Sequence, residues 1–168
     1  MTLDLLLTRR SIRKYTDQPV TDDQVRTILR AAMAAPSAGD QRPWEFLVLR
    51  DPAIREAITH HHPHASMLPS AAVAILVVGD PRRQKHENYW PVDCSIATQN
   101  LLLAVHALGL GAVWLGVYPR MERVSALAKL LALPDPITPF ALVSIGYPAE
   151  AKGPAERYEE SRVHWDRW

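Results

Sequence analysis

Four cationic side chains and a hydroxyl lie close together near the start of the chain, in the run Arg9-Arg10-Ser11-Ile12-Arg13-Lys14. Each guanidinium carries five N–H donors and no acceptor, so neighbouring arginines cannot satisfy one another. Burying such a cluster is costly unless an anion is buried with it. A phosphate would fit, because the planar fork of arginine matches its oxygens while serine and backbone N–H groups add donors. These residues alone leave a second interpretation open, a basic run on the solvated surface.

A second stretch rich in hydrogen-bonding groups is Ala35-Pro36-Ser37-Ala38-Gly39-Asp40-Gln41-Arg42-Pro43. Its prolines, its glycine and its short polar side chains exclude a helix or a central strand. We therefore predict a loop with many spare donors and acceptors.

The glycines between Gly109 and Gly116 resemble a dinucleotide-binding fingerprint at first sight. They follow a predicted helix and precede a predicted strand, which is the reverse of the context that such a fingerprint needs. We interpret residues 112–117 as a buried strand whose end, at Gly116, lets another group approach the backbone closely.

Other reactive residue types give weaker signals. The run His60-His61-His62-Pro63-His64 suggests a metal site, but adjacent histidines rarely converge on one ion and no Cys or carboxylate lies beside them, so no metal is predicted. The single cysteine, Cys94, excludes an internal disulfide and indicates a buried thiol in a reducing compartment. No Ser/His/Asp or paired-carboxylate spacing is recognisable, so no catalytic side chain is predicted.

Composition indicates one soluble domain, because 168 residues with 48% hydrophobic and 22% charged content are ordinary for a globular protein. The net charge of +1 gives no general attraction to nucleic acid or to an anionic membrane. The arginine pair resembles a twin-arginine export signal, but the acidic residues Asp17 and Asp22 follow it in place of an apolar segment. The apolar run from Leu101 to Tyr118 is interrupted by glycines and is read as a helix followed by a strand. We expect a cytoplasmic protein.

Hydrophobic periodicity and turn signals predict the elements in order. Helices are expected over Leu3–Leu7, from a capping box at Thr21 to about Ala34, from Asp51 through Ile58, from a cap at Asp93 to Gly109 and over Arg120–Leu131; strands are expected over Trp44–Leu49, Ala71–Val78, Ala112–Val117 and Phe140–Gly146. From Pro148 the chain is polar but carries several aromatic residues. It has too little apolar surface to form a core of its own, yet it has more aromatic side chains than a free, solvated tail would carry. We predict that this tail docks along a partner subunit.

Three segments resemble the nitroreductase family of FMN-dependent oxidoreductases, and the resemblance covers nearly the whole chain. Residues 9–13 resemble its N-terminal phosphate motif, residues 35–46 its flavin-contacting loop and residues 109–116 its third flavin segment. The most specific pattern is Pro36-Ser37 followed by Pro43-Trp44-Glu45-Phe46. The resemblance implies an α+β fold, a three-layer α/β/α sandwich with a mostly antiparallel central sheet. Residues 1–168 would form a single FMN-binding domain whose tail, about 150–168, is exchanged across an intertwined homodimer.

By position, the resemblance implies a role for each matching residue in one of two FMN sites at the dimer interface. Arg9, Arg10 and Ser11 would hold the phosphate with Arg157 of the tail, Arg13 would face the pyrimidine end of the flavin, and Leu115 and Gly116 would place a backbone N–H near the ring nitrogen that receives hydride. Pro36, Ser37, Ala38, Asp40 and Arg42 would reach the ring and ribityl chain from the other subunit. The family commonly has Asn at the position of Asp40 and Gln at the position of Arg42.

The activity implied is a ping-pong reaction in which NADH or NADPH reduces FMN, and a small acceptor such as a nitroaromatic or a quinone then reoxidises it. The loops His60–His64 and Arg82–Trp90 are expected to border the acceptor pocket. The altered Asp40 and Arg42 keep an alternative open, a protein that binds and sequesters FMN without turnover.

Overall fold

The computed structural model describes residues 2–168, and its core is a sheet of four antiparallel strands in the order β1-β2-β4-β3. The strands are β1 (Trp44–Leu49), β2 (Val73–Gly79), β3 (Gly111–Gly116) and β4 (Thr138–Gly146). The central strands β2 and β4 are buried along almost their entire length, as their continuous apolar runs predict. Strand β3 lies at an edge and has β4 as its only strand neighbour in the sheet of the described chain.

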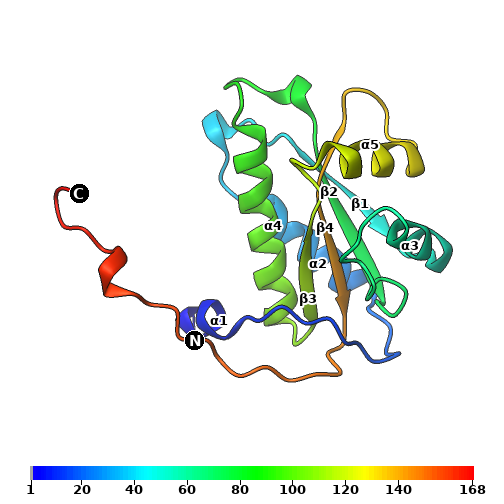
Figure 1. Ribbon diagram of the computed structural model, residues 1–168, viewed down its shortest axis with the longest axis horizontal. Coiled ribbons are helices and arrows are strands. Elements are labelled where there is room, and N and C mark those ends of the chain that lie inside the picture. The colour runs from blue at the N-terminus through cyan, green and yellow to red at the C-terminus, as the bar shows by residue number, and fades with distance from the viewer. Residues whose placement is uncertain (1) are drawn as a thin grey trace.

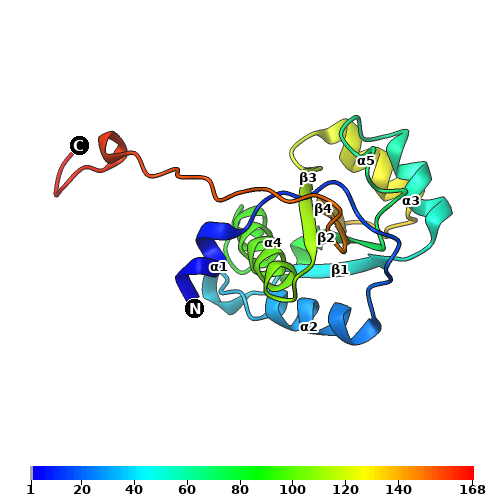
Figure 2. The same ribbon diagram turned by 90° about the horizontal axis from the view of Figure 1, so that it is seen from below.

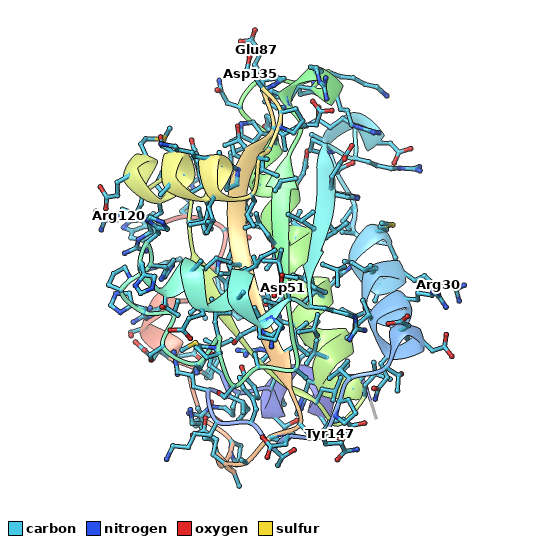
Figure 3. The ribbon with its side chains drawn as sticks, turned by 90° about the vertical axis from the view of Figure 1, so that its right-hand side faces the viewer. Arg30, Asp51, Glu87, Arg120, Asp135 and Tyr147 are labelled. Carbon is cyan, nitrogen blue, oxygen red and sulfur yellow. The ribbon has the colours of Figure 1, made fainter. Side chains whose placement is uncertain are left out.

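Helices cover both faces of this sheet, which confirms the predicted three layers (Figures 1 and 2). Helices α2 (Asp22–Met33) and α4 (Trp90–Ala107) cover one face, while α3 (Pro52–Thr59) and α5 (Met121–Leu130) cover the other. Alternate residues of one strand enter the two cores, as the pleat requires: Ile75 packs on the α2/α4 side and Leu76 on the α3/α5 side. Figure 3 looks onto the α3/α5 layer, with Asp51 at the start of α3 and Arg120 just before α5.

Local sequence signals account for several helix boundaries. The predicted capping box at the start of α2 is present, since the Gln24 N–H donates to Thr21 Oγ1 at 3.2 Å and the Thr21 N–H donates to Gln24 Oε1 at 3.0 Å. The Asp51 side chain accepts from the Ala53 N–H at 2.8 Å and caps α3. These two boundaries therefore follow from side-chain chemistry alone.

The start of α4 corrects one prediction. The helix begins at Trp90, one turn before Asp93, and no side chain caps it. Pro91 suits this first turn because proline lacks the N–H that would have no partner there. Asp93 is only 1% exposed and its carboxylate is used by another segment, the loop described below. The interpretation of Cys94 holds: the residue is fully buried, and burial together with Asp93 raises the pKa of its thiol to about 12.

The two ends of the chain meet at one end of the molecule. After helix α1 (Thr2–Thr8), residues 9–16 run beside the sheet, where the Ile12 N–H donates to the Ala112 carbonyl and the Thr16 N–H to the Tyr147 carbonyl, both at 2.9 Å. Tyr147 marks this end in Figure 3, and Glu87 and Asp135 mark the opposite end. Residues 154–158 still lie beside α1, and beyond them the tail extends away from the other elements (Figures 1 and 2); Trp165 and Trp168 are 80% and 101% exposed.

Two strand boundaries differ slightly from the prediction. β2 begins two residues later than expected, at Val73, and β4 begins two residues earlier, at Thr138, because Thr138 and Pro139 still pair with Gly79 and Val78 across a bulge. Within residues 2–168 no helix combines the length and the apolar character that crossing a membrane requires.

Candidate functional site

Arginines from both ends of the chain converge at the start of the N-terminal segment. Arg9, Arg10 and Arg157 line one hollow of about 500 Å³ beside α1. The pKa of Arg9 is lowered, first by partial burial and then by the positive charges of Arg157 and Arg10. Among residues 2–168, neither Arg9 nor Arg157 forms an ion pair with a carboxylate. Three cations held this close repel one another, and a bound anion would relieve the repulsion.

The next residues of the segment are held by their backbone. Lys152 Nζ donates to the Ser11 carbonyl at 2.7 Å, and Glu150 Oε1 accepts from the Arg13 N–H at 2.6 Å. The side chains of Ser11 and Arg13 have no hydrogen-bond partner in the described part of the chain. Arg13 is exposed and lines a second hollow with Tyr15, Ser66, Met67 and Ser70. The supporting roles of Glu150 and Lys152 could not be predicted from local sequence, because these residues lie 137 and 141 positions after Arg13 and Ser11, whose backbone they hold.

The end of β3 offers an accessible backbone. The Ala112 carbonyl accepts from the Ile12 N–H on the side of β3 away from β4. The backbone groups of every second residue in a strand point to the same side, so the N–H and carbonyl of Gly116 also point away from β4, toward the free edge at the end of the strand. Two hydrogen bonds to the Gly116 carbonyl, from His62 and Arg123, agree with this orientation. A Cβ added to Gly116 would meet nothing within 4 Å, so there is space beside it. The neighbouring Leu115 is 3% exposed and faces β4 with its backbone, which makes the Gly116 N–H the more accessible of the two.

Two side chains at this strand end were not predicted as site residues. His62, which is 2% exposed, has its Nε2 at 2.9 Å from the Gly116 carbonyl oxygen, and Arg123 Nη1 donates to the same oxygen at 2.8 Å. His62 Nδ1 accepts from the His64 N–H at 3.3 Å, so the proton lies on Nε2. Burial is the main cause that lowers the pKa of His62, and the charge of Arg123 lowers it further. Among residues 2–168 no group of three or more His, Cys, Asp or Glu side chains could hold a metal ion.

The loop of residues 36–43 is held from the inside by buried polar groups. Asp93 accepts from the Ala38 N–H at 2.9 Å and from Gln41 Nε2 at 2.6 Å. Gln41 Oε1 in turn accepts from the backbone N–H groups of Lys85 and His86, at 2.8 and 3.0 Å. The buried members of this network, Asp93 and Gln41, are therefore satisfied within one chain.

The loop presents Asp40 and Arg42 on its outer side as an ion pair. Arg42 Nε donates to Asp40 Oδ1 at 2.6 Å, and this hydrogen bond lowers the pKa of Asp40. Both residues have a positive φ, 53° and 44°, as does Gly39 at 52°. The Arg42 N–H donates to Ser37 Oγ at 3.0 Å, which helps to hold this left-handed backbone.

The predicted site residues thus form separate groups within one chain. The loop contacts the first turn of α4 at Asp93, whereas Thr8, next to the arginines, contacts His106 in the last turn of α4 at 2.9 Å. At 1.5 Å per residue these points lie about 20 Å apart along the helix. Figure 1 shows the loop and α1 at opposite ends of α4. Within one chain the two groups therefore lie at opposite ends of α4.

Comparison with known proteins identifies the family of this chain. The profile of the nitroreductase family matches residues 6–62 and 59–147. A relative from Methanothermobacter thermautotrophicus, provisionally named an NADH dehydrogenase/NAD(P)H nitroreductase, is 46% identical over 166 residues, which cover 99% of this chain and 87% of the relative. The crystal structure of a protein with the same provisional name from Parabacteroides distasonis has a TM-score of 0.96 at 42% identity and covers 99% of this chain and 98% of that one.

A further crystal structure includes the cofactor that the sequence suggests. It is that of a provisionally named nitroreductase from Desulfovibrio desulfuricans in complex with FMN, with a TM-score of 0.86 at 35% identity, covering 99% of this chain and 96% of that one. The chain therefore belongs to the nitroreductase family and is an oxidoreductase of the NAD(P)H nitroreductase type.

Proposed function

We propose that this chain binds FMN and uses NADH or NADPH to reduce small acceptors such as nitroaromatics or quinones by a ping-pong reaction. The observation that carries the proposal is the convergence of Arg9, Arg10 and Arg157 without a carboxylate partner in the described chain. A phosphate monoester supplies the missing negative charge and the acceptor oxygens. FMN contains such a group, and the structural relative from Desulfovibrio desulfuricans was solved with it.

In this proposal the N-terminal segment holds both ends of the cofactor. Arg9, Arg10, Arg157 and the free hydroxyl of Ser11 would donate to the phosphate. Arg13, which is exposed beside Ser66, Met67 and Ser70, would face the pyrimidine end and favour negative charge there. Glu150 and Lys152 would keep this segment in place by holding its backbone.

Bound FMN would supply the redox chemistry, accepting hydride from a reduced nicotinamide and passing it to an acceptor. The backbone of this chain would orient the reactive ring, with the Gly116 N–H directed toward it from the free edge of β3. No side-chain acid or nucleophile is then needed, and Leu115 would contribute by packing in the core behind the ring. The loops of residues 60–64 and 82–90 would border the space for the acceptor.

A second copy of the chain would complete each site. The loop residues Pro36, Ser37, Ala38, Asp40 and Arg42 lie at the far end of α4 from the arginines, so their contact with the flavin would be made in the partner's site. The extended tail, with Trp165 and Trp168 almost fully exposed, would dock along that partner. We therefore propose an intertwined homodimer with two FMN sites.

The test uses the colour of the protein. The purified chain should be yellow, or turn yellow with added FMN, and NADH or NADPH under argon should bleach it. Admitting a quinone or a nitroaromatic should then restore the colour. A protein that takes up no FMN in excess contradicts the proposed binding, and a flavin band unchanged by either nucleotide contradicts the proposed reduction.

One observation favours a second candidate, sequestration of FMN without turnover. The Asp40–Arg42 ion pair directs two charged side chains toward each other at positions where the family resemblance leads us to expect the neutral amides Asn and Gln. Tight FMN binding without reoxidation by any acceptor in a panel of quinones and nitroaromatics would support sequestration.

A further inference from the structure

We propose that His62 and Arg123 are positioning residues that hold the carbonyl of Gly116 and thereby keep the end of β3, with the Gly116 N–H, in place against the flavin ring. The inference rests on the proposed function, because it assigns Gly116 to the ring. The two side chains come from different places, His62 from the loop after α3 and Arg123 from the first turn of α5. Both direct a donor to the same carbonyl oxygen, at 2.9 and 2.8 Å.

The backbone at this point needs external support. Glycine has the greatest backbone freedom of any residue, and Gly116 is exposed at the end of an edge strand. The Gly116 N–H belongs to the peptide group that also contains the Leu115 carbonyl, and this group is restrained by the pairing of β3 with β4. The two donors hold the next peptide group at the Gly116 carbonyl and restrain ψ of Gly116, so the backbone is held on both sides of this glycine. The N–H of Gly116 therefore keeps one direction. A hydrogen bond weakens steeply when its angle departs from linearity, so a fixed direction matters to whatever the N–H contacts.

The chemistry of each donor suits this role. His62 is held as a neutral Nε2–H tautomer, because Nδ1 accepts from the His64 N–H and burial disfavours the charged ring. Arg123 adds a permanent positive charge beside the carbonyl, and its Nη1 lies 3.5 Å from His62 Nε2. Arg123 Nε is buried and has no hydrogen-bond partner in the described chain, so Nη1 carries the interaction at this strand end.

The inference predicts a separation between binding and reactivity. Affinity for FMN would depend mainly on the phosphate contacts of Arg9 and Arg157, on another part of the chain. Loosening Gly116 should therefore leave the FMN dissociation constant within about threefold while slowing flavin reduction by about 10- to 100-fold, as small misplacements of reacting groups do. Removing the charge of Arg123 should also make the flavin midpoint potential more negative.

The experiment compares His62→Leu, His62→Gln and Arg123→Met with the unchanged protein. Glutamine can still donate to the carbonyl, so His62→Gln should recover most of the reduction rate that His62→Leu loses. The matched control is Arg120→Met, because Arg120 is also an arginine at the start of α5, is exposed, and makes no side-chain bond among residues 2–168 (Figure 3). Each protein is measured for FMN affinity by fluorescence quenching, for the rate of bleaching by NADH under argon, for midpoint potential and for urea midpoint.

Slow reduction and a more negative potential in Arg123→Met, with FMN affinity retained and the control unchanged, would support the inference. An unchanged reduction rate and an unchanged midpoint potential in Arg123→Met would overturn it. A slower reduction accompanied by an equal loss of FMN affinity and of urea midpoint would also overturn it, because general destabilisation would then explain the rate. Arg123 is more exposed than His62, so Arg123→Met decides the question even if His62→Leu does not fold. Failure of the unchanged protein to bind FMN would instead contradict the proposed function.

Discussion

The two regions assigned to the same cofactor differ in how their polar groups are satisfied. In the loop of residues 36–43, Asp93 and Gln41 exchange hydrogen bonds with the loop and with residues 85–86, and Asp40 pairs with Arg42. In the N-terminal segment the backbone is held, but Arg9 and Arg157 have no partner of opposite charge in the described chain. The loop is complete without a ligand, whereas the arginine cluster is not.

This difference indicates two kinds of contribution to one site. A segment whose buried groups are already satisfied keeps its shape in the absence of ligand, and binding then costs little additional ordering. A cluster of repelling cations gains stability when an anion arrives, and it supplies binding energy. We expect the loop to fix geometry and the arginines to fix affinity.

The largest expected effect comes from shortening the tail. A chain ending at Arg157 keeps the arginine cluster but loses the exposed aromatic residues from Tyr158 onward. If these residues dock on a partner, the shortened protein should sediment as a monomer and lose its FMN, which ultracentrifugation and the flavin absorbance would report. Arg162→Ala in the full chain is the control, because Arg162 pairs only with Glu159 within the exposed tail. A shortened chain that remains a yellow dimer would show that residues 158–168 are dispensable.

Removing one cation from the cluster should have the next largest effect. Arg9→Ala should weaken FMN binding by about 1.5 to 3 kcal/mol, the usual range for a hydrogen bond to a charged group. Without FMN the same change should not lower stability, because it relieves repulsion with Arg157 and Arg10. Fluorescence titration measures the first effect and urea unfolding of the flavin-free protein the second. The control Arg26→Ala removes an exposed helical arginine paired with Asp23. Equal FMN affinity in Arg9→Ala and Arg26→Ala would remove Arg9 from the phosphate site.

Removing Asp93 should lower the stability of the flavin-free protein, whereas removing Arg9 should not. Asp93→Ala leaves the Ala38 N–H and the buried amide of Gln41 without their acceptor, which should lower the free energy of unfolding by about 1 to 3 kcal/mol. The loss should be present in the flavin-free protein, since the network needs no ligand. Asp40→Asn is the control, because it breaks only an exposed ion pair and should leave the urea midpoint unchanged. An Asp93→Ala protein destabilised only when FMN is bound would mean that the loop is not complete by itself.

The sequence predicted what local chemistry decides. The capping box at Thr21, the cap at Asp51 and the buried strand at residues 73–79 all follow from short-range patterns, and the structure has them. Asp93 stands before an apolar helix, and this position predicts a helix cap. Its actual partners, Ala38 and Gln41, lie more than 50 residues earlier, at separations of 55 and 52, and no local rule relates them.

The same limit applies to the candidate site. Arg9 and Arg10 could be singled out because they are adjacent, whereas Arg157, far along the chain, is implied only by the family resemblance. The loop of residues 36–43 could be predicted because its prolines and serine stand at fixed spacing. The interaction of His62 and Arg123 with Gly116 joins three elements that are separate in sequence, so it required the fold. A histidine within a histidine run gives no local sign that only one of them is buried.

The smallest expected effect concerns the protonation of His62. Like Asp93, His62 is buried and has its hydrogen-bond partners within the same chain. Its pKa in the folded protein lies below the ordinary value of 6.5, chiefly because of burial, so below about pH 6.5 the unfolded chain binds more protons than the folded one. The stability associated with His62 is therefore present above that pH and is lost as the pH falls toward the folded pKa. Urea midpoints measured between about pH 7.5 and 5 should fall less steeply in His62→Gln than in the unchanged protein, and equal slopes would show that His62 titrates alike in both states.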